Sequence, residues 1–362
     1  MSESDQTSEA TSRQPLMQLE DVSQIFHTKK GNRPAVRDVN LTVNAGEVLC
    51  LVGESGCGKT TNARMAAGLN KPTAGRVLYN GHDIWQLNKS DFAEFRTAVQ
   101  YVHQDPYASL NPIRTVFKTL AAPMRRHGLV KNNREAWDRA SELLRRVDLT
   151  PPETYLNKFP HQLSGGQRQR VSVARALTLD PKLIIADEST SMLDVSIRVG
   201  MLNMLGKLRD DLGVGFLFIA HDLAIAKYFG WAGRTAVMYL GRVVEYGPTP
   251  EVINNPQHPY TKALLNAVPE PDPDLAAKKL PGGGLRSADI PSLAALPTGC
   301  TFHPRCPRFE EGLCDVTGPE LTPIDPKREV ACHVVVRERE RGTIAPAELA
   351  KPTVSLTGAK QK

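Results

Sequence analysis

The stretch GESGCGKT, residues 53–60, limits the possible folds of this chain more than any other feature. It lies between an apolar run, VLCLV, and a stretch that favours a helix, KTTNARMAAGL. Gly53, Gly56 and Gly58 allow the backbone to curl so that its N–H groups converge, and the helix that follows adds the positive end of its dipole. A strand, a glycine-rich loop and a helix in this order predict a phosphate-binding loop.

The loop predicts a nucleotide site rather than a simple turn, because a glycine-rich structural turn would not need the flanking strand and helix. Lys59 is expected to contact the outer phosphates, and the Thr60 hydroxyl is expected to bind magnesium. Cys57 is interpreted as a filler at a variable position and not as a redox sensor. The residues expected to contact ATP here are Gly53, Glu54, Ser55, Gly56, Cys57, Gly58, Lys59, Thr60 and Thr61.

A second half of the site is expected at the end of another apolar strand, where LIIADES supplies two adjacent carboxylates. Asp187 would hold the magnesium ion, directly or through water, and Glu188 would polarise the attacking water. Acidic pairs after strands are also common surface features. Together with the phosphate-binding loop, however, this pair predicts hydrolysis of ATP.

The order of apolar segments predicts an α/β fold with a buried, largely parallel sheet. Short strands are expected from residue 17 to about 53, and residues 112–178 read as mostly helical. Continuous apolar strands then return at 182–187, 215–221 and 234–247. This alternation is typical of a nucleotide-binding domain with a helical insertion.

The segment LSGGQRQRVSVARAL, residues 163–177, resembles the signature of the ATP-binding subunits of ABC transporters. It would form a second anion cradle, with a serine hydroxyl, two glycine N–H groups and a helix dipole. In that family two subunits face head to tail, ATP joins them and hydrolysis releases them. The positions that would cover the partner's ATP are Leu163, Ser164, Gly165, Gly166 and Gln167.

Further residues match positions of the same family. The resemblance implies that Gln104 senses magnesium, that His221 contacts the γ-phosphate and that Asp194 links the two sites of the dimer. Phe26 matches the aromatic that stacks on adenine, although an aromatic in a strand is more often part of a core. Ser189 departs from the family, which usually has proline there; the serine would loosen the strand exit without removing a functional group.

The C-terminal region resembles that of importers for dipeptides and oligopeptides, whose relatives also import nickel, glutathione or oligosaccharides. The resemblance rests on NNPQHPYTKALLNAVPEPDP and on the order of the cysteines in GCTFHPRCPRFEEGLC and VACH. It implies two integral membrane permease subunits and a second ATPase subunit, identical or not, as partners, with an external solute-binding protein acting indirectly. The permease would be contacted through residues 104–114. The transported solute stays open.

Four cysteines in this region, Cys300, Cys306, Cys314 and Cys332, suggest a separate module. A reducing compartment argues against two disulfides, and the spacings are wider than those of usual zinc sites. Unliganded buried cysteines are a further alternative. The resemblance to importers favours a 4Fe–4S cluster over zinc, with a structural role preferred to a redox-sensing one.

Length and composition agree with a large domain plus extensions. The chain of 362 residues carries a net charge of +6, and its longest apolar runs are shorter than a membrane-spanning helix. The N-terminus is polar and carries no signal-like apolar stretch, so we expect the chain in the cytoplasm. The resemblance to importers implies that it lies there on the face of the inner membrane. The expected divisions are a disordered tail at 1–16, the ATPase domain at 17–265, an extension at 266–336 and a disordered basic tail at 337–362.

Two other functional classes compete with the importer. One is a soluble ABC-type ATPase that acts on nucleic acid or ribosomes; such proteins usually carry two nucleotide domains or a long coiled coil, and neither pattern occurs here, so no nucleic acid partner is expected. The other makes the cysteine-bearing extension a metal or redox sensor whose output is the ATPase.

Overall fold

Two sheets form the framework of the protein in the computed structural model, which describes residues 15–29, 31–190, 193–267, 284–293 and 295–342. Within these residues the central sheet has the strand order β11-β12-β10-β9-β3-β8-β7-β6 and the second sheet the order β2-β1-β4-β5. The central strands are β3 (Val48–Val52), β6 (Val99–Val102), β7 (Leu183–Asp187), β8 (Gly215–Ala220), β9 (Arg234–Tyr239), β10 (Arg242–Pro248), β11 (Thr322–Asp325) and β12 (Arg328–Val330).

The strands from β9 to β6 run parallel, as the sequence predicts, and they are buried on both faces. Side chains of β3 alternate between the two faces: Cys50 and Val52 join one core, whereas Leu49 and Leu51 join the other. Such continuous apolar strands are what a sheet covered on both sides requires. The carboxyl ends of β3 and β7 therefore bring the phosphate-binding loop and the acidic pair to the same edge.

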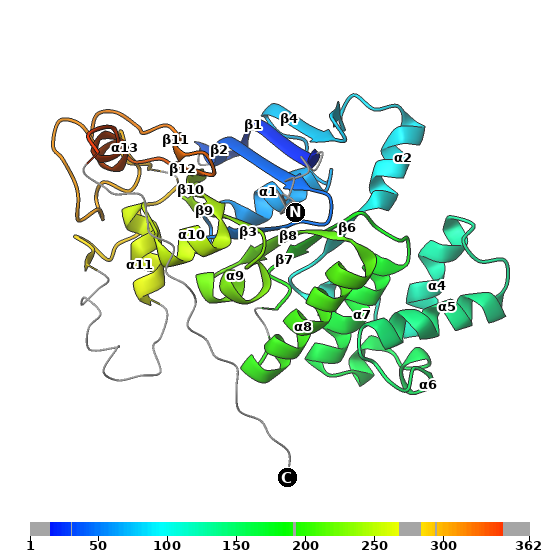
Figure 1. The fold of residues 1–362 in the computed structure, drawn as a ribbon. Helices are drawn as coiled ribbons and strands as arrows, with labels where there is room; N and C mark the ends of the chain where they lie inside the picture. The colour runs from blue at the N-terminus through cyan, green and yellow to red at the C-terminus, as the bar shows by residue number, and fades with distance from the viewer. Residues whose placement is uncertain (1–14, 30, 191–192, 268–283, 294, 343–362) are drawn as a thin grey trace, which may run out of the picture.

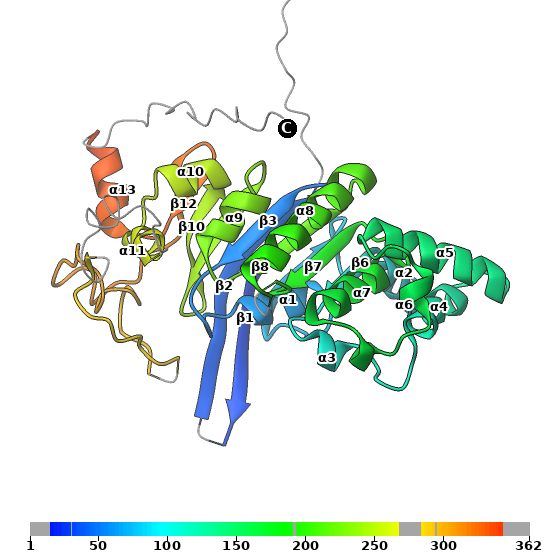
Figure 2. The same cartoon turned by 90° about the horizontal axis from the view of Figure 1, so that it is seen from below.

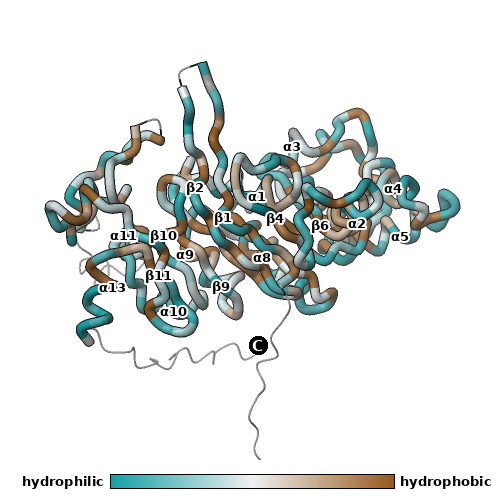
Figure 3. The backbone as a smooth tube through the Cα atoms, turned by 90° about the horizontal axis from the view of Figure 1, so that it is seen from above, coloured by the Kyte–Doolittle hydropathy of each residue, from teal (hydrophilic) through white to brown (hydrophobic). Residues whose placement is uncertain are grey.

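The second sheet is antiparallel, and sequence reasoning did not separate it from the central sheet. It consists of β1 (Pro15–Thr28), β2 (Gly31–Asn44), β4 (Ala74–Tyr79) and β5 (His82–Asp83). Figure 1 shows it above the central sheet, with helix α1 (Lys59–Ala66) between them. The end of the β1–β2 ribbon projects from the body in Figures 2 and 3.

Helices cover the other face of the central sheet and form a lobe at one side of the molecule (Figure 1). α4, α5, α6 and α7 lie within the stretch 112–178 that the sequence predicts to be mostly helical. The bounds are α2 (Lys89–Ala98), α3 (Pro106–Ser109), α4 (Val116–Arg126), α5 (Asn133–Arg146), α6 (Glu153–Leu156), α7 (Gly165–Leu177), α8 (Val195–Leu212), α9 (Leu223–Phe229), α10 (Thr249–Asn254), α11 (Pro259–Ala267) and α13 (His333–Glu340).

The extension differs from the separate module that the sequence suggests. Its strand β12 pairs with β10, with Glu245 opposite Val330 and Tyr246 opposite Glu329, so it continues the central sheet. Helix α13 also reaches Glu340, beyond the predicted start of the tail at residue 337. The predicted tails fall largely on residues 1–14 and 343–362, which lie outside the described residues, as do residues 268–283 of the extension.

Candidate functional site

The phosphate-binding loop joins β3 to α1, as predicted, and two of its glycines lie where no side chain fits. Gly53 has φ +159°, and a Cβ there would lie 2.2 Å from the Met238 carbonyl oxygen. Gly58 has φ +107°, and its Cβ would lie 2.5 Å from the Ala35 oxygen. Both positions therefore require glycine. The loop borders a cavity of about 260 Å³, lined by Ala35, Ser55, Gly56, Gly58, Lys59, Thr60, Thr61, Gln104, Glu188 and His221.

Lys59 is held inside the curl of the loop. Its Nζ donates to the Gly53 oxygen at 2.7 Å and to the Glu54 oxygen at 3.0 Å, and it lies 3.7 Å from Glu188 Oε1. The ammonium group is thus fully paired and nearly buried at the floor of the cavity. Burial raises the pKa of the neighbouring Cys57 thiol, while the charge of Lys59 lowers it. Because the thiolate is the reactive form of cysteine, a thiol that stays protonated agrees with the prediction that Cys57 only occupies a variable position of the loop and does not sense redox changes.

Two of the three predicted magnesium ligands, Thr60 and Asp187, meet across the two strand ends, whereas the third, Gln104, bonds to Glu188. The Thr60 hydroxyl donates to Asp187 Oδ1 at 3.0 Å, and the Tyr101 hydroxyl donates to Asp187 Oδ2 at 2.6 Å. Burial, followed by the charge of Asp187, raises the pKa of Tyr101, so the phenol stays a proton donor. A hydroxyl and a carboxylate at the cavity are hard oxygen ligands of the kind that Mg²⁺ prefers.

Glu188 contacts three other polar side chains that line the cavity. Its Oε2 accepts a hydrogen bond from Gln104 Nε2 at 2.7 Å and lies 2.8 Å from His221 Nε2. Its backbone has φ 44°, a left-handed conformation that is uncommon for a residue with a side chain and is concentrated at functional sites. The structure therefore brings together Lys59, Gln104, Glu188 and His221, four residues that the sequence singled out separately.

The comparisons with known proteins agree with this geometry. Residues 36–191 match the family model described as ABC transporter, and residues 244–314 match the oligopeptide/dipeptide transporter, C-terminal region. A protein of Sinorhizobium fredii named as a probable peptide ABC transporter ATP-binding protein is 44% identical over 326 residues, covering 88% of this chain and 90% of that protein. The chain belongs to the ABC transporter ATP-binding proteins. The family prediction from the sequence is confirmed.

Two further comparisons extend the match. The oligopeptide transport ATP-binding protein OppF of Salmonella typhimurium is 41% identical over 326 residues, covering 88% of this chain and 93% of that protein. A dimeric ATP-binding cassette solved in a post-hydrolysis state with ADP and phosphate is 29% identical with a TM-score of 0.58, covering 64% of this chain and 98% of that one. The α/β fold predicted from the sequence is thereby confirmed. This chain is an ATPase. Among the described residues no helix combines the length and apolar character needed to cross a membrane.

The signature segment starts helix α7 and lies apart from the cavity of its own chain. Ser164 caps the helix: its hydroxyl accepts the Gln167 N–H at 3.3 Å, and Gln167 Oε1 accepts the Ser164 N–H at 3.0 Å. A Cβ on Gly166 would lie 2.7 Å from Ile197 Cγ2. None of the described residues that line the cavity belongs to 163–167.

Phe26 and Asp194 also lie away from the cavity lining. Phe26 is 41% exposed on the projecting β1–β2 ribbon, opposite Arg33. Asp194 stands directly before α8, and its side chain is exposed. Their predicted roles, adenine stacking and communication across the dimer, stay predictions.

The four cysteines of the extension gather in one region. The Cys300 N–H donates to the Cys314 oxygen at 2.8 Å. Burial raises the pKa of Cys300 to about 12, with smaller contributions from the charges of Cys332, Cys306 and Cys314. Burial raises the pKa of Cys306 to about 11. In the described part of the chain, no three His, Cys, Asp or Glu side chains are arranged to hold a metal ion.

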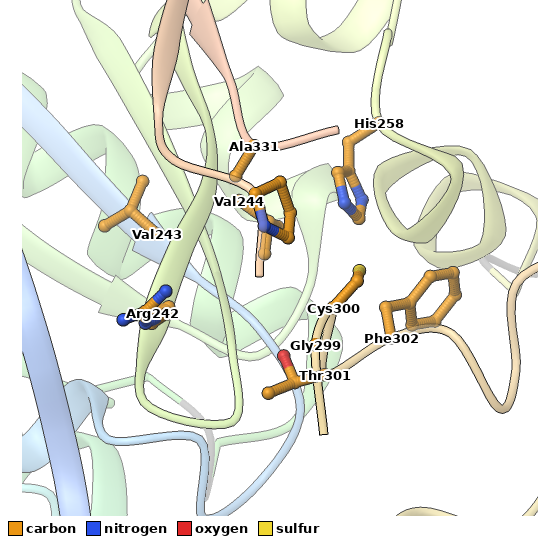
Figure 4. A pocket seen from close by; sticks show the side chains of 10 residues that line it. Arg242, Val243, Val244, His258, Gly299, Cys300, Thr301, Phe302 and Ala331 are labelled. Atoms are coloured by element: carbon orange, nitrogen blue, oxygen red, sulfur yellow. The ribbon is translucent and has the colours of Figure 1, made fainter. Parts of the chain in front are cut away.

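Figure 4 shows the Cys300 sulfur between the rings of His258 and Phe302, at a small cavity. Burial lowers the pKa of His258 to about 3. Its Nδ1 accepts the Tyr260 N–H at 3.0 Å. His258 is therefore a neutral ring with a structural role. His303 lies close to Cys300 in the sequence, and its Nδ1 is 3.0 Å from the Cys300 carbonyl oxygen, which accepts a hydrogen bond from it.

Sequence reasoning missed Tyr101 and Arg305. Tyr101 lies on β6, the neighbour of β7, so its contact with Asp187 depends on strand pairing, which no local motif reveals. Arg305 reaches Glu54 of the phosphate-binding loop from 251 residues away in the sequence. Both needed the tertiary structure to be found.

Proposed function

We propose that this ATPase powers the import of peptides or related small solutes through a membrane permease. The observation that carries the proposal is the match of residues 244–314 to the oligopeptide/dipeptide transporter C-terminal region, on a chain whose relatives are named for peptide transport. The solute itself would be selected by the permease and the external binding protein, because an ATPase of this kind does not touch it.

The residues at the cavity divide into distinct roles in this proposal. Lys59 exchanges its carbonyl contacts in the loop for phosphate oxygens, and Thr60 and Asp187 hold magnesium, which neutralises phosphate charge. Glu188 orients and polarises water. Gln104 would sense magnesium and His221 would contact the γ-phosphate, and both also bond to the Glu188 carboxylate. The mutual hydrogen bonds of these groups support a site that is largely pre-formed.

ATP hydrolysis in the proposal needs two subunits. The signature residues 163–167 of one subunit would cover the ATP of the other, which is supported by their distance from the cavity of their own chain. Asp194 would then lie at the contact between the two sites, and Phe26 would stack on adenine. All motifs are present in this chain, which fits either an identical partner or a sister subunit.

The permease contact is proposed at residues 104–114, on the cytoplasmic face of the inner membrane. Tyr107 and Ile113 are 63% and 81% exposed, unusual for large apolar side chains. The Arg168 guanidinium of the signature helix lies 3.7 Å from the centre of the Tyr107 ring, and Arg175 of the same helix donates to the Ser109 oxygen at 2.6 Å. A movement of α7 on ATP binding would therefore reach this surface directly.

The test is capture of the full-length tagged chain from gently solubilised membranes, with every copurifying protein identified. Two multi-helix permease subunits, with or without a second ATPase, support the proposal. Recovery with ribosomes or nucleic acid, or recovery without any membrane protein, contradicts it. A double variant, Tyr107→Ser with Ile113→Ser, should lose the permease subunits. Tyr228→Ser, which changes another exposed aromatic on a different face, should retain them.

We further propose a 4Fe–4S cluster as the group held by the four extension thiols. The donor set fits a metal–thiolate centre: the four cysteines lie close together, and the Arg308 N–H donates to Cys306 Sγ at 3.4 Å. A single tetrahedral zinc ion would need sulfurs about 3.8 Å apart at a Zn–S distance of about 2.3 Å. The described residues show no three His, Cys, Asp or Glu side chains arranged to hold a metal ion, so the proposal rests on the order of the cysteines and on the resemblance to importers.

Iron, acid-labile sulfide and zinc are to be quantified in chain purified without oxygen. The proposal expects iron and sulfide in equal amounts, and their loss in Cys306→Ser. Cys50→Ser, which changes a buried cysteine of β3 far from the extension, should keep both. Zinc in place of iron, or no metal in either protein, contradicts the proposal without affecting the assignment as an ATPase.

A further inference from the structure

An ion pair joins the cysteine-bearing extension to the phosphate-binding loop. Arg305 Nη1 and Nη2 donate to Glu54 Oε2 and Oε1 at 2.9 and 3.0 Å, the two-pronged geometry that makes such pairs strong. Arg305 is only 5% exposed. An extension that merely lay against the ATPase would not need to bury a cation against this loop.

The surroundings of Arg305 hold it in one place. The guanidinium lies 5.7 Å from the ring centre of Tyr239 and 5.8 Å from that of Phe302. Burial alone lowers the pKa of Arg305, but its hydrogen bonds to Glu54 and Tyr239 raise it overall, so the cation is retained. Tyr260, which packs on Tyr239 and Phe302, accepts the Glu54 backbone N–H at 3.0 Å. Glu54 is therefore fixed by both its side chain and its main chain.

Glu54 has a position that makes its charge matter. Its main-chain oxygen binds the Lys59 ammonium, and the next residue, Ser55, lines the cavity. Glu54 itself is not among the described residues that line the cavity, but a negative charge one residue from that lining would disfavour a bound triphosphate through the repulsion of like charges. The Arg305 cation cancels this charge.

We propose that Arg305 is a positioning residue of the ATP site, supplied by the extension to neutralise Glu54 and to hold the phosphate-binding loop in its ATP-binding conformation. The inference goes beyond the proposed transport function and does not depend on it, nor on the group bound by the thiols. It makes the extension part of the nucleotide site. Arg305 directly precedes Cys306, so the same side chain connects the thiol-bearing turn with the loop.

The experiment uses the full-length chain and measures ATP affinity, KM for ATP and kcat. Arg305→Met keeps most of the side-chain volume and removes the charge; it should weaken ATP affinity and raise KM about tenfold, with kcat within twofold. Adding Glu54→Gln to Arg305→Met removes the uncompensated carboxylate and should restore affinity to within twofold of the wild type. This rescue distinguishes charge cancellation from a structural role, which the second substitution would not repair.

Arg328 supplies the matched control. It is an equally buried arginine of the extension, and it pairs with Asp325 and Glu251 away from the loop. Arg328→Met should leave ATP affinity unchanged even if it lowers the melting temperature. Equal loss of ATP affinity in the Arg305 and Arg328 variants, or absence of rescue in the double variant, overturns the proposal.

If Arg305→Met does not accumulate as folded protein, the single variant Glu54→Gln tests the proposal instead. The glutamine can still accept a bond from Arg305, and the cation would then face the phosphates without a counter-charge. With the negative charge removed, ATP should bind more tightly than to the wild type. Unchanged or weaker binding by this variant overturns the proposal.

Discussion

Replacing Glu188 by Gln tests the assignment of the catalytic carboxylate. The two side chains have the same shape, and a glutamine oxygen can still accept the bonds from Gln104 and His221 that Glu188 Oε2 accepts at 2.7 and 2.8 Å. The substitution removes the ion pair made by the other oxygen, Oε1, which lies 3.7 Å from Lys59 Nζ. Removing one partner of a buried ion pair leaves the Lys59 ammonium with its two carbonyl acceptors, so we expect the free energy of unfolding to fall by up to about 3 kcal/mol.

The effect on turnover should be far larger. General base catalysis contributes about 10²- to 10⁴-fold, so the activation barrier should rise by about 3 to 5 kcal/mol. ATP should still bind, because Lys59 and Thr60 are untouched, and an ATP-bound dimer should accumulate and be visible by light scattering. Turnover is measured by phosphate release at saturating ATP.

Glu245→Gln is the control for this variant. Glu245 is fully buried and accepts the N–H groups of Gln257 and His258 at 2.8 and 2.9 Å, away from the cavity. This variant should change stability and leave kcat intact. Undiminished turnover in Glu188→Gln would refute the role given to Glu188.

Two further predictions follow from buried polar groups. Tyr101→Phe removes a donor to the Asp187 carboxylate and should lower the free energy of unfolding by about 1.5–3 kcal/mol in urea titrations, whereas Tyr228→Phe, at an exposed hydroxyl, should stay within about 0.5 kcal/mol. The folded pKa of His258, about 3, lies below the unfolded value of about 6.5, so its stabilisation is complete above pH 6.5 and is lost as the pH falls toward 3. When the pH falls from 7.5 to 5, this group should lower the free energy of unfolding by about 2 kcal/mol. If His258→Gln shows the same dependence of the free energy of unfolding on pH as the wild type, the assignment is wrong.

The sequence predicted those parts of the molecule that depend on local order. The loop at 53–60, the carboxylates after β7 and the parallel strands each have a continuous pattern of their own. Chain topology then brings them together, because parallel strands end at the same edge of a sheet. Gln104 and His221 required the family resemblance, since a lone glutamine or histidine has no pattern.

The contacts that the sequence did not reveal join residues far apart in the chain. The antiparallel sheet contains strands that precede the phosphate-binding loop in the sequence and strands that follow it. The sequence of a short strand does not indicate which sheet the strand joins. The strands β11 and β12 lie in a proline-rich, polar region whose pairing with β10 depends on a partner about 85 residues earlier. Arg305 is an ordinary basic residue in the sequence, and only its burial against Glu54 sets it apart.

The extension is needed by the ATPase body as much as it needs that body. Without β12, the edge of β10 would be an unpaired row of N–H and C=O groups, which is a liability in any sheet. The extension, for its part, has a small core of its own, with Val330, Cys332, Val334 and Val335 buried. A core of this size cannot sustain a fold without a cross-link, a metal centre or a larger partner. The paired edge and the Arg305–Glu54 contact supply the larger partner, so the extension is a structural part of the ATP-binding unit.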